Sequence, residues 1–400
     1  MNIFHRYVVR EHITPFLYAF FVIMFVLILK LMLDLMDMII SKHVDIITMA
    51  KLLVYNLAWM IALVVPMSVL VATVMAYGRM AAANEIMAMK AAGMSMLRLS
   101  TPIIGLSILI TIFMIWFNNR ILPEANQKTR DLRASIILKK PMLSLKNREG
   151  QFITDIQNLM IRVDSLNYTT GEMHGITLFR RGERNTRTAI RAARGHFIPD
   201  EGQDRLTIVL MDGEIHQIDD GNSSRYVRGR FSEFMYNLDF AFSMSQQTAV
   251  KNDRTMTSAE MREEIVRIEG MNNHLKNRNM KLPRDDTGIS ARRRNFARDI
   301  VINNKRIAQY LVEIHKKNSI PFAAIVFVLV GAPLGILVRR SGASIGISLS
   351  IGFFVIYYLF LIGGESAGDR MLVKPWLAMW APNLFLVPFG VILFIYATRK

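Results

Sequence analysis

Few residues of this chain have the types and spacing that catalysis requires. The 400 residues include no cysteine, which excludes disulfides, thiolate metal sites and cysteine nucleophiles. None of the eight histidines has metal-ligand spacing, and the sequence has no P-loop pattern for ATP binding. The stretch Gly364–Gly368 fits the Gly-x-Ser-x-Gly pattern of a nucleophile elbow, but that motif acts only on a strand–turn–helix, and Ser366 is expected in a flexible loop. The sequence therefore predicts no catalytic residue, no metal site and no cofactor.

The segment Asn84–Ser95 is the first candidate for binding a partner. Its pattern predicts a helix with Asn84 as the cap, Glu85 in the first turn and Gly93 near the end. The segment is too short to cross a membrane and too apolar for a free loop. Its Met and Ala side chains suit a groove on a partner protein, where Glu85 would be met by an Arg or Lys. A helix lying on the membrane surface is the alternative.

Ionisable residues within the first apolar segment are the second candidate. Lys30, Asp34 and Asp37 recur at i, i+4 and i+7 and therefore share one helical face. Charged groups at such positions are costly and usually face a bundle interior or a cavity. Lys30 is therefore a candidate for binding an anionic substrate. The alternative is that Lys30 pairs with Asp34 and that the acids lie in the membrane interface.

Three arginines after the third apolar segment are the last candidate. Arg120, Arg130 and Arg133 follow the point where the chain passes from an apolar segment into a long polar block. They could guide an anionic head group out of a membrane, or they could belong to the solvated start of a helix.

Six apolar segments are long enough, at about 20 residues, to position these groups in a membrane. They are Thr14–Met36, Leu52–Gly78, Pro102–Phe117, Ile320–Val338, Ala343–Ile362 and Trp376–Tyr396. The chain is 52% hydrophobic with a mean hydropathy of +0.26, between the values of soluble and wholly membrane-embedded proteins. The sequence predicts six transmembrane helices around a polar block at 119–317.

The first part of this block reads as β structure. Leu159, Ile161 and Val163 alternate with polar residues, and the Asp212-Gly213 pair is a hairpin signal. Turn signals every 8–12 residues indicate a sandwich or jelly roll. The predicted fold is an α+β membrane protein with a β-jelly-roll domain between the third and fourth transmembrane helices.

The second part of the block reads as two charged helices, Ser258–Met280 and Thr287–Lys316, the first starting at a capping box of Thr257 and Glu260. The predicted domains are an N-terminal membrane half at 1–118 with a partner-binding helix at 84–97, a β domain at 119–257, a helical connector at 258–317 and a C-terminal membrane half at 318–400.

The short loops predict the orientation of the chain. With the N-terminus inside, nine basic residues flank the inner side and four flank the outer side. The inner residues are Arg6, Arg10, Arg79, Lys90, Arg98, Arg339, Arg340, Arg399 and Lys400; the outer ones are Lys42, Lys51, Arg370 and Lys374. This bias favours cytoplasmic termini and a periplasmic polar block. The net charge of +17 is spread along the chain, which argues against a nucleic-acid partner.

Together these features resemble the lipopolysaccharide-export permeases of the LptF/LptG type over nearly the whole chain. The matching stretches are Glu85–Ser95, Asn119–Asn126 and Pro321–Gly335, and the last is more similar to the LptF type. One departure is the helical stretch from Ser258 to Lys316, which is longer than the usual linker of the family.

The resemblance implies a permease in the bacterial inner membrane that pairs with a second, homologous permease to enclose a cavity for lipopolysaccharide. It also implies a cytoplasmic ABC ATPase dimer docked on the coupling helices, and β jelly rolls that pass the lipid to a periplasmic bridge protein with a similar β domain. On this basis Glu85, Lys90 and Gly93 would contact the ATPase, and Lys30 would face the lipid phosphates, with Arg120, Arg130 and Arg133 beyond it.

Two other classes of protein fit the sequence less well. A membrane-anchored periplasmic scaffold or adaptor would need no transport cycle and is the main alternative. An intramembrane hydrolase is disfavoured, because no histidine lies within a predicted span and no nucleophile is better placed than Ser366.

Overall fold

The computed structural model of the protein describes most of the chain as two compact units. The described residues are 3–42, 46–139, 149–156, 159–167, 170–181, 186–199, 206–219, 226–238, 251–280, 287–338 and 343–399. The first unit, called the bundle unit below, comprises Met1–Met32, Leu53–Gln127 and Asn252–Lys400. The second, called the sheet unit, comprises Leu33–Leu52 and Lys128–Lys251.

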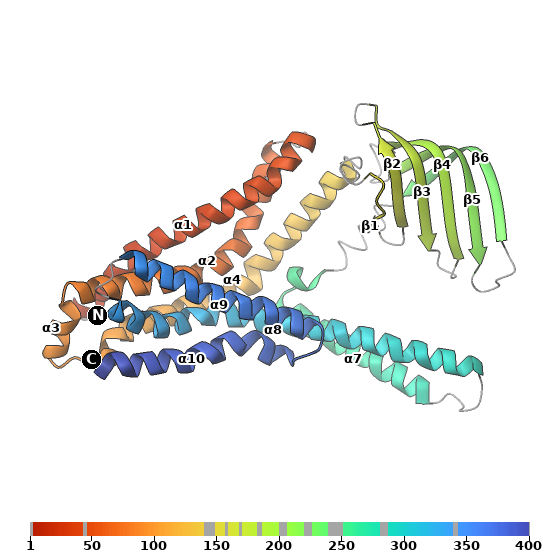
Figure 1. The fold of residues 1–400 in the computed structure, drawn as a ribbon. Coiled ribbons are helices and arrows are strands. Elements are labelled where there is room, and N and C mark those ends of the chain that lie inside the picture. Colours follow the sequence, from red (N-terminus) through yellow and green to blue (C-terminus); the bar gives the residue numbers. More distant parts are fainter. Residues whose placement is uncertain are drawn as a thin grey trace. The chain divides into compact units, whose positions relative to one another are not determined.

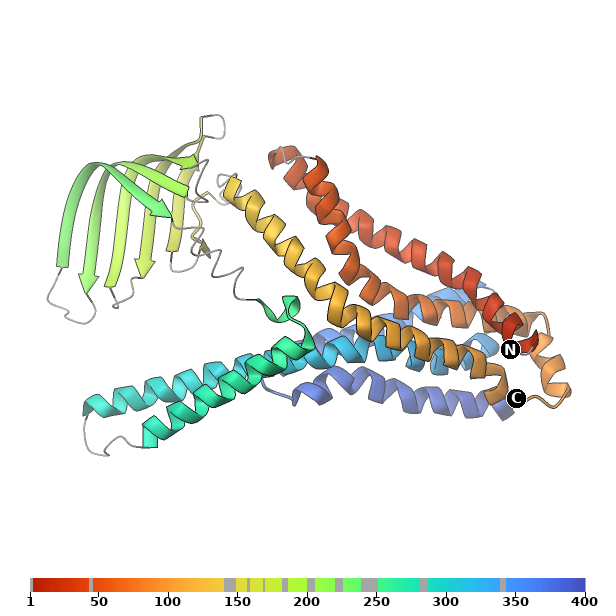
Figure 2. The same cartoon turned by 180° about the vertical axis from the view of Figure 1, so that it is seen from behind.

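Six helices in the described residues are long and apolar enough to cross a membrane, which confirms the six predicted spans. They are α1 (Ile3–Lys42), α2 (Ile46–Ala82), α4 (Met96–Lys139), α8 (Thr287–Leu337), α9 (Ala343–Asp369) and α10 (Pro375–Arg399). The short helix α3 (Glu85–Ala91) joins α2 to α4. Within the bundle unit, α3 and both ends of the chain lie at the same end of the helices (Figure 1), and the view from behind agrees (Figure 2).

Helices α2 and α8 form the centre of the bundle. Two thirds (67%) of the most apolar window of each is buried, against 17% for α1 and 22% for α9. Glycines allow the two central helices to approach closely: a Cβ added to Gly335 would lie 2.6 Å from the backbone oxygen of Val74. The glycine at the end of the Pro321–Gly335 stretch thus permits close contact between these two helices.

The sheet unit contains one six-stranded antiparallel sheet, curved in Figures 1 and 2. Its strands are β1 (Ile153–Ile156), β2 (Leu159–Leu166), β3 (Glu172–Arg181), β4 (Thr186–Pro199), β5 (Leu206–Asp219) and β6 (Tyr226–Leu238). Strand order equals chain order, so the predicted jelly roll takes the form of a single meander among the described strands. The α+β class with a sheet between the third and fourth spans is confirmed.

The predicted hairpin at Asp212-Gly213 is wrong, because both residues lie inside β5. Asp212 has a φ of 53°, and the pairing with β6 passes from Met211–Glu233 to Gly213–Phe231 without an Asp212 pair. The residue interrupts the pairing without reversing the chain, since β5 continues in the same register with the strands on both sides.

The connector helices begin where the sequence predicts them. The helix α7 (Ser258–Met280) starts with the expected capping box: Glu260 Oε2 accepts from the Thr257 N–H at 2.8 Å, and Thr257 Oγ1 accepts from the Glu260 N–H at 3.2 Å. The helix α8 runs for 51 residues from Thr287 through the fourth span without a break. The helix α4 also continues past the predicted boundary at 118/119, to Lys139.

Candidate functional site

Two groups of side chains in the bundle unit could carry function. The first, called the α3 anchor, consists of Tyr7, Glu85, Ile86, Lys90 and the backbone of Ala397. The second, called the polar junction, lies where α4, the 3-10 helix η1 (Asp253–Thr255), α8 and α9 meet. The polar junction consists of Asn118, Asn126, Arg254, Glu313, Lys316, Lys317 and Glu365.

The helix α3 is shorter than the predicted 84–97. It ends at Ala91, where the N–H of Gly93 donates to Lys90 O at 2.9 Å and the N–H of Met94 donates to Met89 O at 3.1 Å. These two bonds form a Schellman motif, which requires the left-handed backbone that Gly93 adopts at φ 83°. Asn84 stands at the N-cap position as predicted, but its side chain makes no capping hydrogen bond.

Polar contacts hold α3 to both ends of the chain. The Tyr7 hydroxyl of α1 donates to Glu85 Oε2 at 2.7 Å. At the other end of α3, Lys90 Nζ donates to the carbonyl oxygen of Ala397 in α10 at 2.8 Å. Ile86 is 3% exposed and belongs to an apolar cluster that also contains residues of α1, α2, α4, α8 and α10. The short helix is therefore part of the bundle and not a free loop.

The outward side of α3 is apolar and accessible. Met87 is 46% exposed, and Ala88 and Ala91 are exposed as well. An anchored helix with an exposed Met and Ala surface has the character of a binding face for a groove on another protein.

The predicted substrate residues occupy two helices. Lys30 is exposed on α1, while Arg120 and Arg133 are exposed and Arg130 is half-buried on α4. Lys30 and Arg120 belong to the bundle unit, whereas Arg130 and Arg133 belong to the sheet unit. Lys30, Arg120 and Arg133 are accessible, and a shared role of the four cations in binding a lipid stays a prediction.

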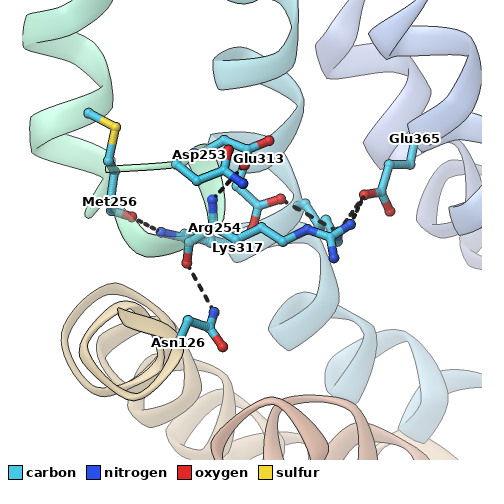
Figure 3. Close-up of polar contacts among 9 residues, drawn as sticks. Asn126, Asp253, Arg254, Met256, Glu313, Lys317 and Glu365 are labelled. Atoms are coloured by element: carbon cyan, nitrogen blue, oxygen red, sulfur yellow. Dashed lines mark hydrogen bonds and ion pairs between the residues drawn. The ribbon is translucent and has the colours of Figure 1, made fainter. Parts of the chain in front are cut away.

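Charged side chains at the polar junction meet at Glu365; its contact with Arg254, whose side chain is 65% exposed, is drawn in Figure 3. Glu365 Oε1 accepts from Lys316 Nζ at 2.8 Å and from Arg254 Nη2 at 3.3 Å. Lys316 Nζ also lies 3.5 Å from Glu313 Oε2, and these two side chains are only 18% and 10% exposed. Buried charges persist in proteins when they are paired in this way. Helices α8 and α9 are thereby joined to η1, which follows the sheet unit in the chain.

Pro321 explains the position of Asn118. A proline inside a helix has no N–H, so the carbonyl of Lys317, four residues earlier in α8, lacks its helical donor. Asn118 Nδ2 of α4 donates to that carbonyl at 3.2 Å. Asn118 is only 2% exposed, so water has little access to this bond. The Asn118 amide therefore takes the place of the missing helical donor.

Further bonds tie η1 and the start of α7 to the membrane helices. Lys317 Nζ donates to the carbonyl oxygen of Met256, and Asn126 Nδ2 of α4 donates to the carbonyl oxygen of Arg254 at 3.0 Å (Figure 3). Ser258 Oγ donates to Asn119 Oδ1 at 2.5 Å. The stretch Asn119–Asn126, singled out from the sequence, is therefore the place where α4 meets the chain again after the sheet unit.

The loop predicted around Ser366 is wrong, because Gly364–Gly368 lies in the last turns of α9. Ser366 is exposed there and is not part of a strand–turn–helix. The two glycines serve packing: a Cβ on Gly364 would lie 2.2 Å from the Ala378 carbonyl oxygen, and one on Gly368 would lie 2.6 Å from Val312. Their i, i+4 spacing gives α9 a small-residue face for its neighbours.

Sequence reasoning missed most of the charged members of the polar junction. Glu313 and Lys316 stand at i, i+3 just before a proline at the start of an apolar segment, which was an available signal. Glu365 lies inside Gly364–Gly368, which was interpreted only as a chance match to the nucleophile-elbow pattern. Among the described residues, no group of three or more His, Asp or Glu side chains is placed to hold a metal ion.

The chain matches the family described as "Lipopolysaccharide export system permease LptF/LptG" over residues 6–396. This match spans nearly the whole chain and covers both the LptF and the LptG type. No curated protein matches the chain.

Proposed function

Because the chain belongs to the LptF/LptG family of lipopolysaccharide export permeases, it is a multi-pass inner-membrane permease, and we propose that it is the non-catalytic subunit of an ABC exporter. In this proposal it extracts lipopolysaccharide from the inner membrane and passes it to a periplasmic bridge protein. The observation that carries the proposal is α3, which is fastened to the bundle on one side and apolar and exposed on the other.

Energy for this transport comes from a separate cytoplasmic ATPase dimer, since the sequence has no P-loop. The ATPase docks on α3, where Glu85 meets a cation of the partner, and Lys90 and Gly93 hold the helix and its end in place. ATP binding then shifts the bundle between a state that holds the lipid and one that releases it.

The orientation follows from charge and from the position of the termini. Both chain ends and α3 lie at one end of the bundle (Figure 1), and the short loops expected on that side carry nine of thirteen flanking basic residues. In the proposed arrangement this end is cytoplasmic and the sheet is periplasmic.

The membrane surface supports a paired arrangement. Large apolar side chains are exposed on α1, such as Phe21 (65%) and Phe25 (61%), and on α9, such as Leu359 (64%). A second, homologous permease covers part of this surface and encloses the lipid cavity. Lys30 faces the lipid phosphates there, and Arg120, Arg130 and Arg133 follow along α4.

The sheet supports transfer to a partner of similar build. Among the described strands β1 and β6 form the two edges, and an edge strand offers unpaired backbone groups to another sheet. One face of the sheet is apolar, with Ile161, Ile176 and Leu210 buried in its core. A bridge protein with a similar β domain could extend this apolar face for the acyl chains.

Replacing Glu85 tests the proposal. Glu85→Ala in the purified complex should lower ATPase co-purification and abolish most lipid release. Glu269→Ala, which changes an exposed acid on α7, is the matched control and should leave both unchanged. Intact co-purification with full lipid export in Glu85→Ala would remove this role from Glu85. A wild-type pull-down in mild detergent that captures no ATPase would instead favour a scaffold or adaptor.

Photocrosslinking tests the lipid path. A photoreactive residue at position 30 should crosslink to lipopolysaccharide in the active complex, whereas one at the exposed position of Tyr18 should crosslink to bulk phospholipid. Equal lipopolysaccharide labelling at both positions would contradict a lipid site at Lys30.

A further inference from the structure

Glu85 has a partner within its own chain, and this bears on how it meets another protein. The Tyr7 hydroxyl, near the start of α1, donates to Glu85 Oε2 at 2.7 Å across 78 residues of sequence. A charged acceptor makes this a strong hydrogen bond, and it holds one of the two carboxylate oxygens in place. In the described part of the chain, the other oxygen, Oε1, has no hydrogen-bond partner.

We propose that Tyr7 is a positioning residue for Glu85: its hydroxyl fixes the carboxylate so that Oε1 is presented to a cation of the ATPase. This inference rests on the proposed function of α3. The inference adds to that function a role for Tyr7 of α1, a residue that the ATPase need not contact.

Packing around the pair makes the position of the hydroxyl well defined. Val8, next to Tyr7, is fully buried, and Ile86, next to Glu85, is 3% exposed; both belong to the same apolar cluster. The backbones on the two sides of the hydrogen bond are therefore held in register by buried neighbours. A glutamate side chain on the surface of a short helix would otherwise sample several rotamers, and their loss would weaken binding.

The hydrogen bond also connects the docking helix to α1. Tyr7 joins the first turn of α3 to α1, while Lys90 joins its last turn to the end of α10. A displacement of α3 by the ATPase would then move α1, which carries the candidate lipid residue Lys30. Tyr7 is thus placed to link the ATPase to the helix of the lipid site.

Tyr7→Phe tests this role because it keeps the ring and removes only the hydroxyl. The variant should bind the ATPase up to about tenfold more weakly, the cost of ordering one flexible side chain on binding, and should release less lipid per ATP hydrolysed. Tyr18→Phe, an exposed tyrosine on the same helix, is the matched control and should behave as wild type. In a Glu85→Ala background, Tyr7→Phe should have no further effect on either quantity.

Two outcomes separate failure of this inference from failure of the proposed function. If Glu85→Ala uncouples the complex while Tyr7→Phe keeps wild-type affinity and lipid released per ATP, the positioning role is wrong and the docking role stands. If Glu85→Ala has no effect, the docking role itself fails. A lower unfolding temperature of Tyr7→Phe without any change in affinity or in lipid released per ATP would show a purely structural role and overturn the inference.

A second variant keeps the inference testable if Tyr7→Phe is not recovered folded. Glu85→Asp retains the charge but draws the carboxylate back from Tyr7 by one methylene group. Because the inference requires a carboxylate in one place, Glu85→Asp should lose both affinity and lipid released per ATP. Wild-type values for Glu85→Asp would show that the position of the charge is unimportant and would overturn the inference.

Discussion

The two ends of the membrane bundle are held together by different interactions. At the α3 end, the contacts are mainly apolar, with the Tyr7–Glu85 and Lys90–Ala397 hydrogen bonds at their edge. At the polar junction, three helices and η1 meet through charged and amide side chains, of which Asn118 and Glu313 are buried and Arg254 is exposed. The difference teaches that the junction depends on specific partners, whereas the α3 end depends on packing and keeps an exposed face for another protein.

The physical basis of this contrast is desolvation. Apolar contacts are non-directional and tolerate small displacements, so a helix held by them can shift with a docked partner. A buried charge is costly as soon as its partner is removed, which gives the junction one favoured arrangement. Pro321 adds to this, since it leaves the Lys317 carbonyl without its helical donor, and Asn118 satisfies this carbonyl.

Removing Lys316 should cause the largest loss of stability at the polar junction. Lys316→Ala leaves Glu313 and Glu365 without their shared cation and should destabilise the bundle by about 3–5 kcal/mol. Thermal unfolding of the purified protein in detergent measures the loss. Lys374→Ala, at an exposed position between α9 and α10, is the matched control and should leave the unfolding temperature unchanged. Equal unfolding temperatures for the two variants would show that the junction charges add little.

Asn118→Leu should have the second largest effect. It keeps a similar volume but leaves the Lys317 carbonyl buried without a donor, at a cost of about 1–3 kcal/mol. Pro321→Ala restores the N–H that can satisfy the same carbonyl within α8. The loss of stability caused by Asn118→Leu should therefore be smaller in the Pro321→Ala background, and an equal loss in both backgrounds would contradict this explanation.

Gly93→Ala tests the α3 end, where a local effect is expected. An alanine at φ 83° costs about 1 kcal/mol, although a Cβ there would meet no atom within 4 Å. The end of α3 should shift, and ATPase affinity should fall about fivefold, while global unfolding changes little. Gly105→Ala, also without a neighbour within 4 Å but inside α4, should leave ATPase affinity unchanged. A large loss of global stability in Gly93→Ala would show that this end is as rigid as the junction.

Removing an exposed ion pair on the sheet should change stability least, which contrasts with the buried charges of the polar junction. Arg228, which donates to Glu214 at 2.7 Å, lowers the pKa of that carboxyl below its usual 4.5. A lowered folded-state pKa stabilises the protein above the unfolded-state pKa, and this contribution disappears as the pH falls through the folded-state value.

Wild type should therefore be slightly more stable than Glu214→Gln at pH 7, and the two should converge as the pH falls well below 4.5. Unfolding temperatures of both proteins across this range measure the difference. An effect at pH 7 as large as that of Lys316→Ala would contradict the idea that burial decides the strength of these pairs.

Local signals in the sequence were sufficient for much of the architecture. The six spans follow from apolar segments longer than the width of a bilayer, and the start of α7 follows from Thr257 and Glu260, which interact across three residues. The end of α3 was also signalled by Gly93, although the helix is shorter than predicted. Where a local signal was ambiguous, as at Asp212-Gly213, pairing with two neighbouring strands decided in favour of a continuous strand.

The sequence by itself thus determined the six membrane helices and their order, because these depend on patterns within about 20 neighbouring residues, and the family, because the match extends over residues 6–396. Only the tertiary structure decided which polar groups meet. The hydrogen bond between Glu365 and Lys316 joins residues 49 positions apart in the sequence. The bond between Glu85 and Tyr7 spans 78 positions, and that between Asn118 and the Lys317 carbonyl spans 199. Such pairs leave no periodic pattern in the sequence, since each is set by the packing of whole helices and by the cost of burying an unpaired polar group.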